Sequence, residues 1–193
     1  MTGYYRDQVT QKSWNLLTEL AKNYSFVLIG GWAVWLYTHA LKSKDIDIVV
    51  SHSELGKLGK DFPLIKNDRL KKYEINEGDV QVDIYSPFYS NPGIPAQTIL
   101  DHAVKHEGFM VPRPEDLLSL KLTAYTSRAG SSKGRKDLVD MVSLLRIKTM
   151  DWNRIPAGVL AVALRQTEIP ELSFNRHEYA RLKSEWKKKI AGV

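Results

Sequence analysis

The chain has 193 residues, of which 43% are hydrophobic and 26% are charged. This composition is typical of a globular domain and unlike that of a disordered or fibrous chain. The absence of cysteine excludes disulfide bonds and thiolate-bound zinc. The longest apolar run, from Phe26 to Tyr37, is too short for a membrane span, and the first residues contain no apolar signal core. We therefore expect a soluble cytoplasmic protein with no membrane partner.

The net charge of +6 is spread unevenly along the chain. Residues 121–148 carry seven basic and two acidic side chains, and residues 176–193 carry six and two, so the rest of the chain is acidic. Such basic segments favour an anionic partner, for example a nucleotide or a nucleic acid. For the run Lys187–Lys189, a solvated helix face is an equally good interpretation.

The first half of the chain alternates between helical and strand-like apolar spacing. A Gly30-Gly31 pair separates the first predicted strand from the helix after it, and Glu77-Gly78-Asp79 predicts a hairpin turn. In chain order, we predict helix 8–24, strand 26–29, helix 32–41, strand 44–50, helix 53–60, strand 72–76 and strand 80–85.

The second half has more helical spacing and begins after a turn-rich stretch over residues 86–95. Pro114 followed by two acidic residues predicts a helix start. The predicted elements are helix 96–105, strand 109–111, helix 114–128, helix 135–147, a helix interrupted by proline from Asp151, and a terminal helix from about Asn175.

Carboxylates on apolar strands are the first candidates for chemistry. Asp45 and Asp47 are two residues apart on a predicted strand, so both side chains emerge on the same face. Asp83 lies inside a second apolar strand. Buried acids side by side are costly unless a cation compensates them. If the two strands are neighbours, the three carboxylates converge, and such oxygen donors suit Mg²⁺ or Mn²⁺. The alternative is a solvent-facing edge strand.

The second candidate is the junction at Gly30-Gly31, between a buried strand and a helix. Glycines at a helix start allow backbone amides to approach a ligand closely, and a helix N-terminus favours phosphate. An ordinary tight turn would have the same sequence.

These parts together resemble the DNA polymerase β-like nucleotidyltransferase superfamily, whose pattern is a Gly-Gly or Gly-Ser turn, a downstream Asp-x-Asp and a third acid. The stretch from Phe26 to Val50 looks like the AbiEii type, the toxin of type IV toxin–antitoxin pairs. That type also has a lysine on a later helix and a Lys-Asp pair on the next one. Lys121 to Arg128, and Lys136 with Asp137, are similar in type, order and spacing.

The resemblance implies an α/β (α+β) nucleotidyltransferase fold, with a mixed, mainly antiparallel sheet and flanking helices. Residues 1–112 would form the nucleotidyltransferase core, and residues 113–193 a helical C-terminal region that closes the cleft.

It also implies roles for individual residues. Asp45, Asp47 and Asp83 would bind Mg²⁺ or Mn²⁺, and Asp83 would also help to deprotonate the acceptor hydroxyl. The nucleoside triphosphate would be held by the amides of Gly30 and Gly31 and by the basic side chains Lys121, Arg128 and Lys136. Asp137 would orient one of the lysines or act on the acceptor.

The acceptor is open at this stage. The basic segments favour RNA, for example tRNA, and the AbiEii resemblance implies an antitoxin partner. The alternatives are transfer to a small molecule, as in antibiotic nucleotidyltransferases, transfer to a protein side chain, and a non-catalytic binding module that has kept the fold.

Overall fold

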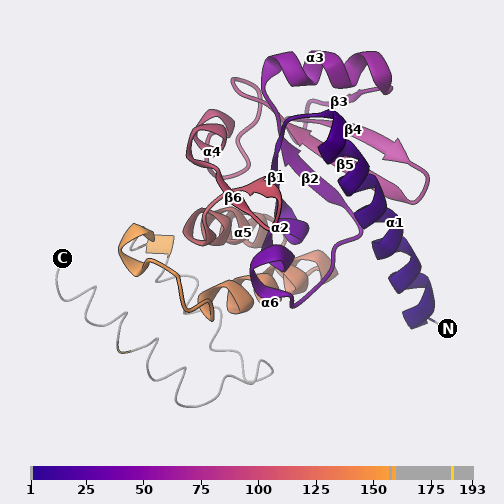
Figure 1. Ribbon diagram of the computed structural model, residues 1–193. Helices are drawn as coiled ribbons and strands as arrows, with labels where there is room; N and C mark the ends of the chain where they lie inside the picture. Colours follow the sequence, from indigo (N-terminus) through magenta and orange to yellow (C-terminus); the bar gives the residue numbers. More distant parts are fainter. Residues whose placement is uncertain (1, 157, 160–183, 185–193) are drawn as a thin grey trace.

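A computed structural model of the chain describes residues 2–156, 158, 159 and 184 (Figure 1). Helices and strands alternate through its first half, and helices dominate after the last strand. The elements are α1 (Thr2–Asn23), β1 (Val27–Ile29), α2 (Gly30–Thr38), β2 (Ile46–Val49), α3 (His52–Asp61), β3 (Ile65–Asn67), β4 (Lys72–Glu77), β5 (Val80–Tyr85), α4 (Ala96–His102), β6 (Val104–His106), β7 (Phe109–Val111), α5 (Pro114–Arg128), α6 (Ser132–Leu145) and the 3-10 turn η1 (Trp152–Arg154).

The strands form one seven-stranded sheet in the order β3-β4-β5-β2-β1-β7-β6. Neighbouring strands are antiparallel except for β2 with β5 and β1 with β7, which are parallel. The predicted fold class, a mixed and mainly antiparallel sheet with flanking helices, is therefore confirmed.

The alternating sequence of the central strands separates an apolar face from a polar face. On β2, Ile46 and Ile48 are completely buried, and on β5, Val82 and Ile84 are buried as well. Because side chains alternate along a strand, the polar residues between them face the other side of the sheet. Burial of the branched side chains fixes the register, since a slip by one residue would exchange the two faces.

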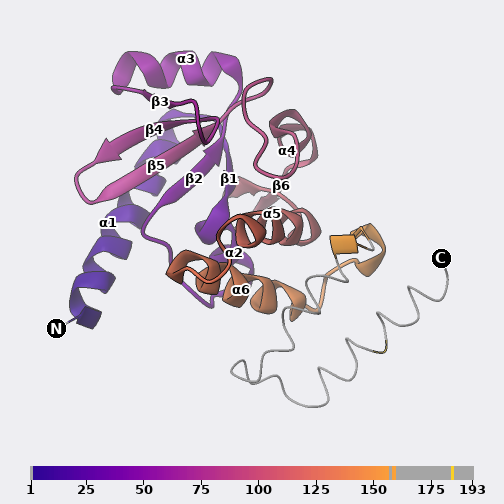
Figure 2. The same ribbon diagram turned by 180° about the vertical axis from the view of Figure 1, so that it is seen from behind.

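Three of the helices, α2, α5 and α6, pack against one another beside the sheet. In both views α5 and α6 lie beside α2, at the opposite end of the molecule from α3 (Figures 1 and 2). Trp32 of α2 is buried, and its Nε1 donates a hydrogen bond to Ser13 Oγ of α1 at 2.9 Å. Ser131 caps α6 by accepting from Gly134 N at 3.0 Å, a typical helix start. The helices after β7 are therefore fixed next to the helix that follows Gly30.

The structure differs from the predicted elements at several boundaries. The helix predicted over 96–105 ends at His102, and Val104–His106 form β6, which pairs with β7. Strand β3 was not predicted, because its three residues carry little apolar pattern of their own. The helix predicted from Trp32 begins at Gly30, which places both glycines inside its first turn.

The end of the chain is described only in part. Where the sequence predicts a helix from Asp151, the structure has the short turn η1. The predicted helix from Asn175 and the run Lys187–Lys189 lie outside the described residues. Among the helices that are described, none combines the length and the apolar character that crossing a membrane requires.

Candidate active site

A row of carboxylates crosses three neighbouring strands on the polar face of the sheet. The parallel register of β2 and β5 places Asp47 opposite Asp83, and the antiparallel register of β4 and β5 places Glu74 opposite Asp83. We call Glu74, Asp83 and Asp47 the acidic row. Directly opposite residues on adjacent strands have neighbouring side chains, so these three acids repel one another unless cations separate them.

Asp45 extends this acidic surface toward the loop before β2. Its side chain is 25% exposed, and its Oδ2 lies 3.5 Å from Lys133 Nζ. Asp45 and Asp47 line the same cavity, as their spacing of two residues predicts.

Gly30 brings the start of α2 against Asp47. Its φ of +67° is in the left-handed region, which favours glycine. A Cβ atom at this position would overlap the Asp47 carboxylate, so a side chain here would displace it. A Cβ atom on Gly31 would lie 2.8 Å from Ser43 Oγ and 2.9 Å from Lys136 Nζ. Both glycines are therefore required for the close approach of the helix start to the site residues.

Asp47 is the member of the acidic row that no cation contacts directly, although Lys121 and Lys136 lower its pKa from a distance. Burial, and then the charge of Asp83, raise the pKa of Asp47 to about 6. Within the described residues, no hydrogen bond or ion pair to its side chain is found. A half-buried carboxylate without a direct partner, held against a glycine on a cavity wall, fits the binding of a divalent cation.

Asp83 is held differently, because protein groups bind both of its oxygens. Gln81 Nε2 donates to Oδ1 at 2.8 Å, and Lys72 Nζ lies 2.6 Å from Oδ2. Burial raises the pKa of Asp83, although Lys72 opposes that shift. Across the described part of the chain, no three His, Cys, Asp or Glu side chains are gathered closely enough to hold a metal ion. Asp45, Asp47 and Asp83 nevertheless line one cavity, and in this metal-free state Lys133 and Lys72 contact Asp45 and Asp83.

Basic residues of α5 form ion pairs with acids of α6 on the side of the site opposite the acidic row. Lys121 Nζ lies 2.6 Å from Asp140 Oδ2 and 3.2 Å from Asp137 Oδ1, and all three side chains are buried. Arg128 also donates to both oxygens of Asp137, at 2.6 and 2.9 Å. Burial lowers the pKa of Lys121, but Asp140 and Asp137 outweigh it and the pKa is raised. The Lys121 charge is therefore balanced within the protein.

Lys136, from the same helix as Asp137, has no direct ion pair within the described residues. Its Nζ donates to Ser43 Oγ at 3.1 Å, and no carboxylate of the described residues is within ion-pair distance. Burial lowers the pKa of Lys136, against the opposing charges of Asp140, Asp47 and Asp45. Of the predicted nucleotide-binding lysines, Lys136 is consequently the one whose charge is available to an anionic ligand.

The two walls enclose a cavity of about 540 Å³, which we call the site cavity. This volume lies within the range of small-molecule binding sites. The predicted site residues that line it come from both walls: Gly31, Asp45, Asp47, Asp83, Lys121, Arg128, Lys136 and Asp137.

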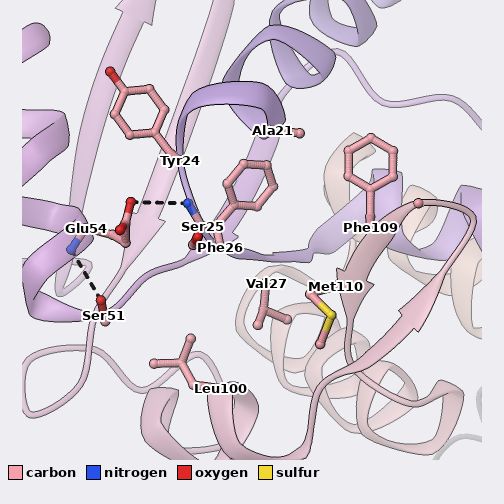
Figure 3. Close-up of a pocket in the computed structure, with 11 residues that line it drawn as sticks. Ala21, Tyr24, Ser25, Phe26, Val27, Ser51, Glu54, Leu100, Phe109 and Met110 are labelled. Carbon is pink, nitrogen blue, oxygen red and sulfur yellow. Dashed lines mark hydrogen bonds between the residues drawn. The ribbon is translucent and has the colours of Figure 1, made fainter.

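A second cavity, of about 480 Å³, lies at the other end of the β1–β2 pair, beside Val27 and Ser51 (Figure 3). Most of its lining is apolar, including Phe109. Its one lining carboxylate, Glu54, accepts a hydrogen bond from Ser25 N at 3.2 Å. Since no group of ionisable side chains lines this second cavity, we place the candidate active site in the site cavity.

Sequence analysis missed Lys72, Glu74 and Ser43. The hairpin contains the signal for the first two, because pairing Glu77 with Val80 across the turn places Glu74 opposite Asp83. Ser43 belongs to a loop and gives no periodic signal.

No protein-family model matches this sequence, and no curated protein is detectably similar to it. An antigenic nucleotidyltransferase-like protein from Paracoccidioides brasiliensis is 19% identical, with a TM-score of 0.44, over 95% of this chain and 88% of that one. The Megavirus polyadenylate synthase is 14% identical, with a TM-score of 0.49, over 77% of this chain and 32% of that one. The antibiotic-resistance factor ANT(2'')-Ia is 13% identical, with a TM-score of 0.48, over 97% of this chain and 95% of that one. Structural neighbours of this chain therefore include nucleotidyltransferase-like proteins. The activity of this chain itself is inferred from its site residues.

Proposed function

We propose that this protein is a metal-dependent nucleotidyltransferase, which moves a nucleoside monophosphate from a nucleoside triphosphate to a hydroxyl acceptor. The observation that carries the proposal is the Asp47 carboxylate, which no described protein group binds directly and which is held against Gly30 at a helix start, in register with Asp83. The other acids that line the site cavity are paired, as Asp137 is. An unpaired buried carboxylate destabilises the fold, so its presence favours a ligand that binds it.

The acidic wall would hold Mg²⁺ or Mn²⁺ through Asp45, Asp47 and Asp83. A divalent ion at such a site stabilises the negative charge that develops on the phosphoryl oxygens. The amides of Gly30 and Gly31, at the start of α2, would bind phosphate oxygens. Lys136 would contribute a charge-assisted hydrogen bond to the triphosphate from the opposite wall.

In the transfer step, the acceptor hydroxyl oxygen forms a bond to the α-phosphorus, and the bond from that phosphorus to the bridging oxygen of pyrophosphate breaks. Asp83 would take the hydroxyl proton, because its buried carboxylate has a raised pKa and faces the site cavity. Pyrophosphate leaves with the bonding electrons. Asp137 would orient Lys121 and Arg128, since both cations bind it.

We further propose that the helical region after residue 112 closes the cleft. Lys121, Arg128 and Lys136, all from that region, line the site cavity together with the acids of residues 1–112. The basic segment 121–148 supports RNA, for example tRNA, as the acceptor. The AbiEii resemblance supports a toxin with an antitoxin partner. A small-molecule acceptor or a protein side chain would use the same acidic row.

A non-catalytic binding module is the rival from another class. It has no need for a buried carboxylate that destabilises the fold, and substitution of Asp47 by asparagine would relieve that cost. The retained acid therefore favours the enzyme.

The test is to incubate the purified chain with each of the four labelled nucleoside triphosphates and Mg²⁺ or Mn²⁺. Total RNA, a mixture of small alcohols, or protein is added as acceptor, and the mass shift of each is measured. We expect transfer by the wild type and none by Asp47→Asn, whereas Asp68→Asn should be fully active, since Asp68 pairs with Lys66 on the surface. Pyrophosphate release that is equal in Asp47→Asn and the wild type would refute the proposed function.

A further inference from the structure

Lys72 is a buried ammonium group within the acidic row. Its side chain is only 8% exposed, and its Nζ lies 2.6 Å from Asp83 Oδ2 and 3.0 Å from Glu74 Oε1. Lys72 and Glu74 are two residues apart on β4, so they share the polar face with Asp83. A positive charge is thus already bound to the third acid of the site.

The two carboxylates that Lys72 binds have different second partners. Asp83 Oδ1 accepts from Gln81 Nε2 at 2.8 Å, which leaves Oδ2 to Lys72. Glu74 Oε1 accepts from Asn67 Nδ2 at 2.9 Å, and Asn67 belongs to the edge strand β3. Glu74 is therefore fixed independently of Asp83, and it offers the ammonium a second anchor that does not line the site cavity.

A divalent ion and the Lys72 ammonium would compete for Asp83 Oδ2. A hard cation binds a carboxylate oxygen at ~2.0–2.6 Å, which is the space the Lys72 Nζ now occupies at 2.6 Å. At such separations two cations repel strongly in a partly buried site. An ion on Asp83 would therefore weaken the contact of Lys72 with Asp83, and a buried lysine without a carboxylate partner would be costly.

We propose that Lys72 is a positioning residue that acts as a resident cation: it holds Asp83 in the metal-free protein, and it keeps Glu74 as its partner when a divalent ion takes Asp83. This inference rests on the proposed metal-dependent function. It assigns to Glu74 the role of retaining the displaced ammonium. Lys72 stabilises the metal-free fold and at the same time weakens the binding of the ion.

The test is calorimetric titration of the full chain with Mn²⁺ alone, together with the melting temperature in the presence and absence of Mn²⁺. Lys72→Met should lower the metal-free melting temperature and bind Mn²⁺ about fivefold to tenfold more tightly, since a competing charge is gone. Lys72 contacts two carboxylates, those of Asp83 and Glu74. In Glu74→Gln, Asp83 is the one that remains, so Lys72 should compete more strongly for Asp83 and Mn²⁺ binding should weaken. Lys57→Met is the matched control, since Lys57 pairs with Glu54 at the same 2.6 Å but is 60% exposed.

If Lys72→Met does not fold, the double variant Lys72→Met/Glu74→Gln keeps the net charge of the wild type. It should bind Mn²⁺ more tightly than Glu74→Gln alone. If a folded variant without Lys72 binds Mn²⁺ no more tightly than its parent, the resident-cation role of Lys72 is overturned. Binding of Mn²⁺ by the wild type would in that case still support the metal site. Failure of the proposed function gives a different result, in which neither the wild type nor any variant binds Mn²⁺; that result overturns both.

Discussion

Replacement of Asp47 by asparagine should stabilise the metal-free protein. Burial and the neighbouring Asp83 raise the pKa of Asp47 from 3.8 to about 6. A shift of that size corresponds to about 3 kcal/mol of unfavourable free energy once the carboxylate is ionised in the folded state. Asparagine has nearly the same shape and no charge, so the variant avoids this penalty. For a chain of this length, about 3 kcal/mol raises the melting temperature by ~6–12 °C.

The pH dependence of this gain identifies its cause. The folded-state pKa of Asp47 lies above the unfolded value, so the folded protein binds the proton more tightly. Wild-type stability is consequently lost as the pH rises from about 4 to about 6. The advantage of Asp47→Asn should be full above about pH 6.5 and absent below about pH 4, where the wild-type residue is neutral in both states.

Urea unfolding at several pH values, with EDTA present, measures this difference directly. Asp45→Asn is the matched control: its carboxylate is 25% exposed and close to Lys133, so the effect should be within about 0.5 kcal/mol. If Asp47→Asn is less stable than the wild type at pH 7.5, or if its gain does not change with pH, then the Asp47 carboxylate is compensated and the electrostatic argument fails.

The remaining predictions separate structural from ligand-binding roles. Lys121→Met should cost about 3–5 kcal/mol in urea unfolding, because it leaves a buried carboxylate without its cation; a well-folded variant would contradict the buried cluster. Lys136→Met should change stability by less than about 1 kcal/mol but weaken triphosphate binding at least about tenfold, and unchanged nucleotide affinity would show that Lys136 does not contact phosphate. Gly30→Ala should destabilise the fold by at least about 1–2 kcal/mol and remove the effect of Mn²⁺ on melting, by displacing the Asp47 carboxylate; a retained metal response would show that the ion binds elsewhere.

Local signals in the sequence explain which parts of the fold could be predicted. Helix 114–128 has the predicted bounds, since Pro114 and two acidic residues define its first turn. The hairpin around Gly78 was also predicted, from its turn residues and flanking alternation. By contrast, β6 was assigned to the preceding helix, because Val104 to His106 acquire their strand conformation by pairing with β7, a contact made across the turn that follows.

The site could be predicted as far as its chemistry depends on residue type and spacing. Acids at alternating positions on apolar strands predicted that Asp47 and Asp83 would be neighbours, and the register confirms it. The partners of each charge depend on tertiary packing instead. The family resemblance implies triphosphate binding for both Lys121 and Lys136. In the structure, Lys121 is buried between two carboxylates, whereas Lys136 donates a hydrogen bond to the Ser43 hydroxyl.

The two walls of the site cavity differ in how their charges are satisfied, and this difference distinguishes function from stability. On α5 and α6, Asp137 and Asp140 each contact at least one cation. On the sheet, Lys72 binds Asp83 while Asp47 has no such partner. A chain selected only for stability would distribute its cations more evenly. The free-energy cost of an unpaired carboxylate is larger than the stabilisation that a second cation adds to a carboxylate that is already paired. Among the described acids that line the site cavity, Asp47 is the one without a directly bound partner, and a ligand bound beside Gly30 therefore gains the most by neutralising it.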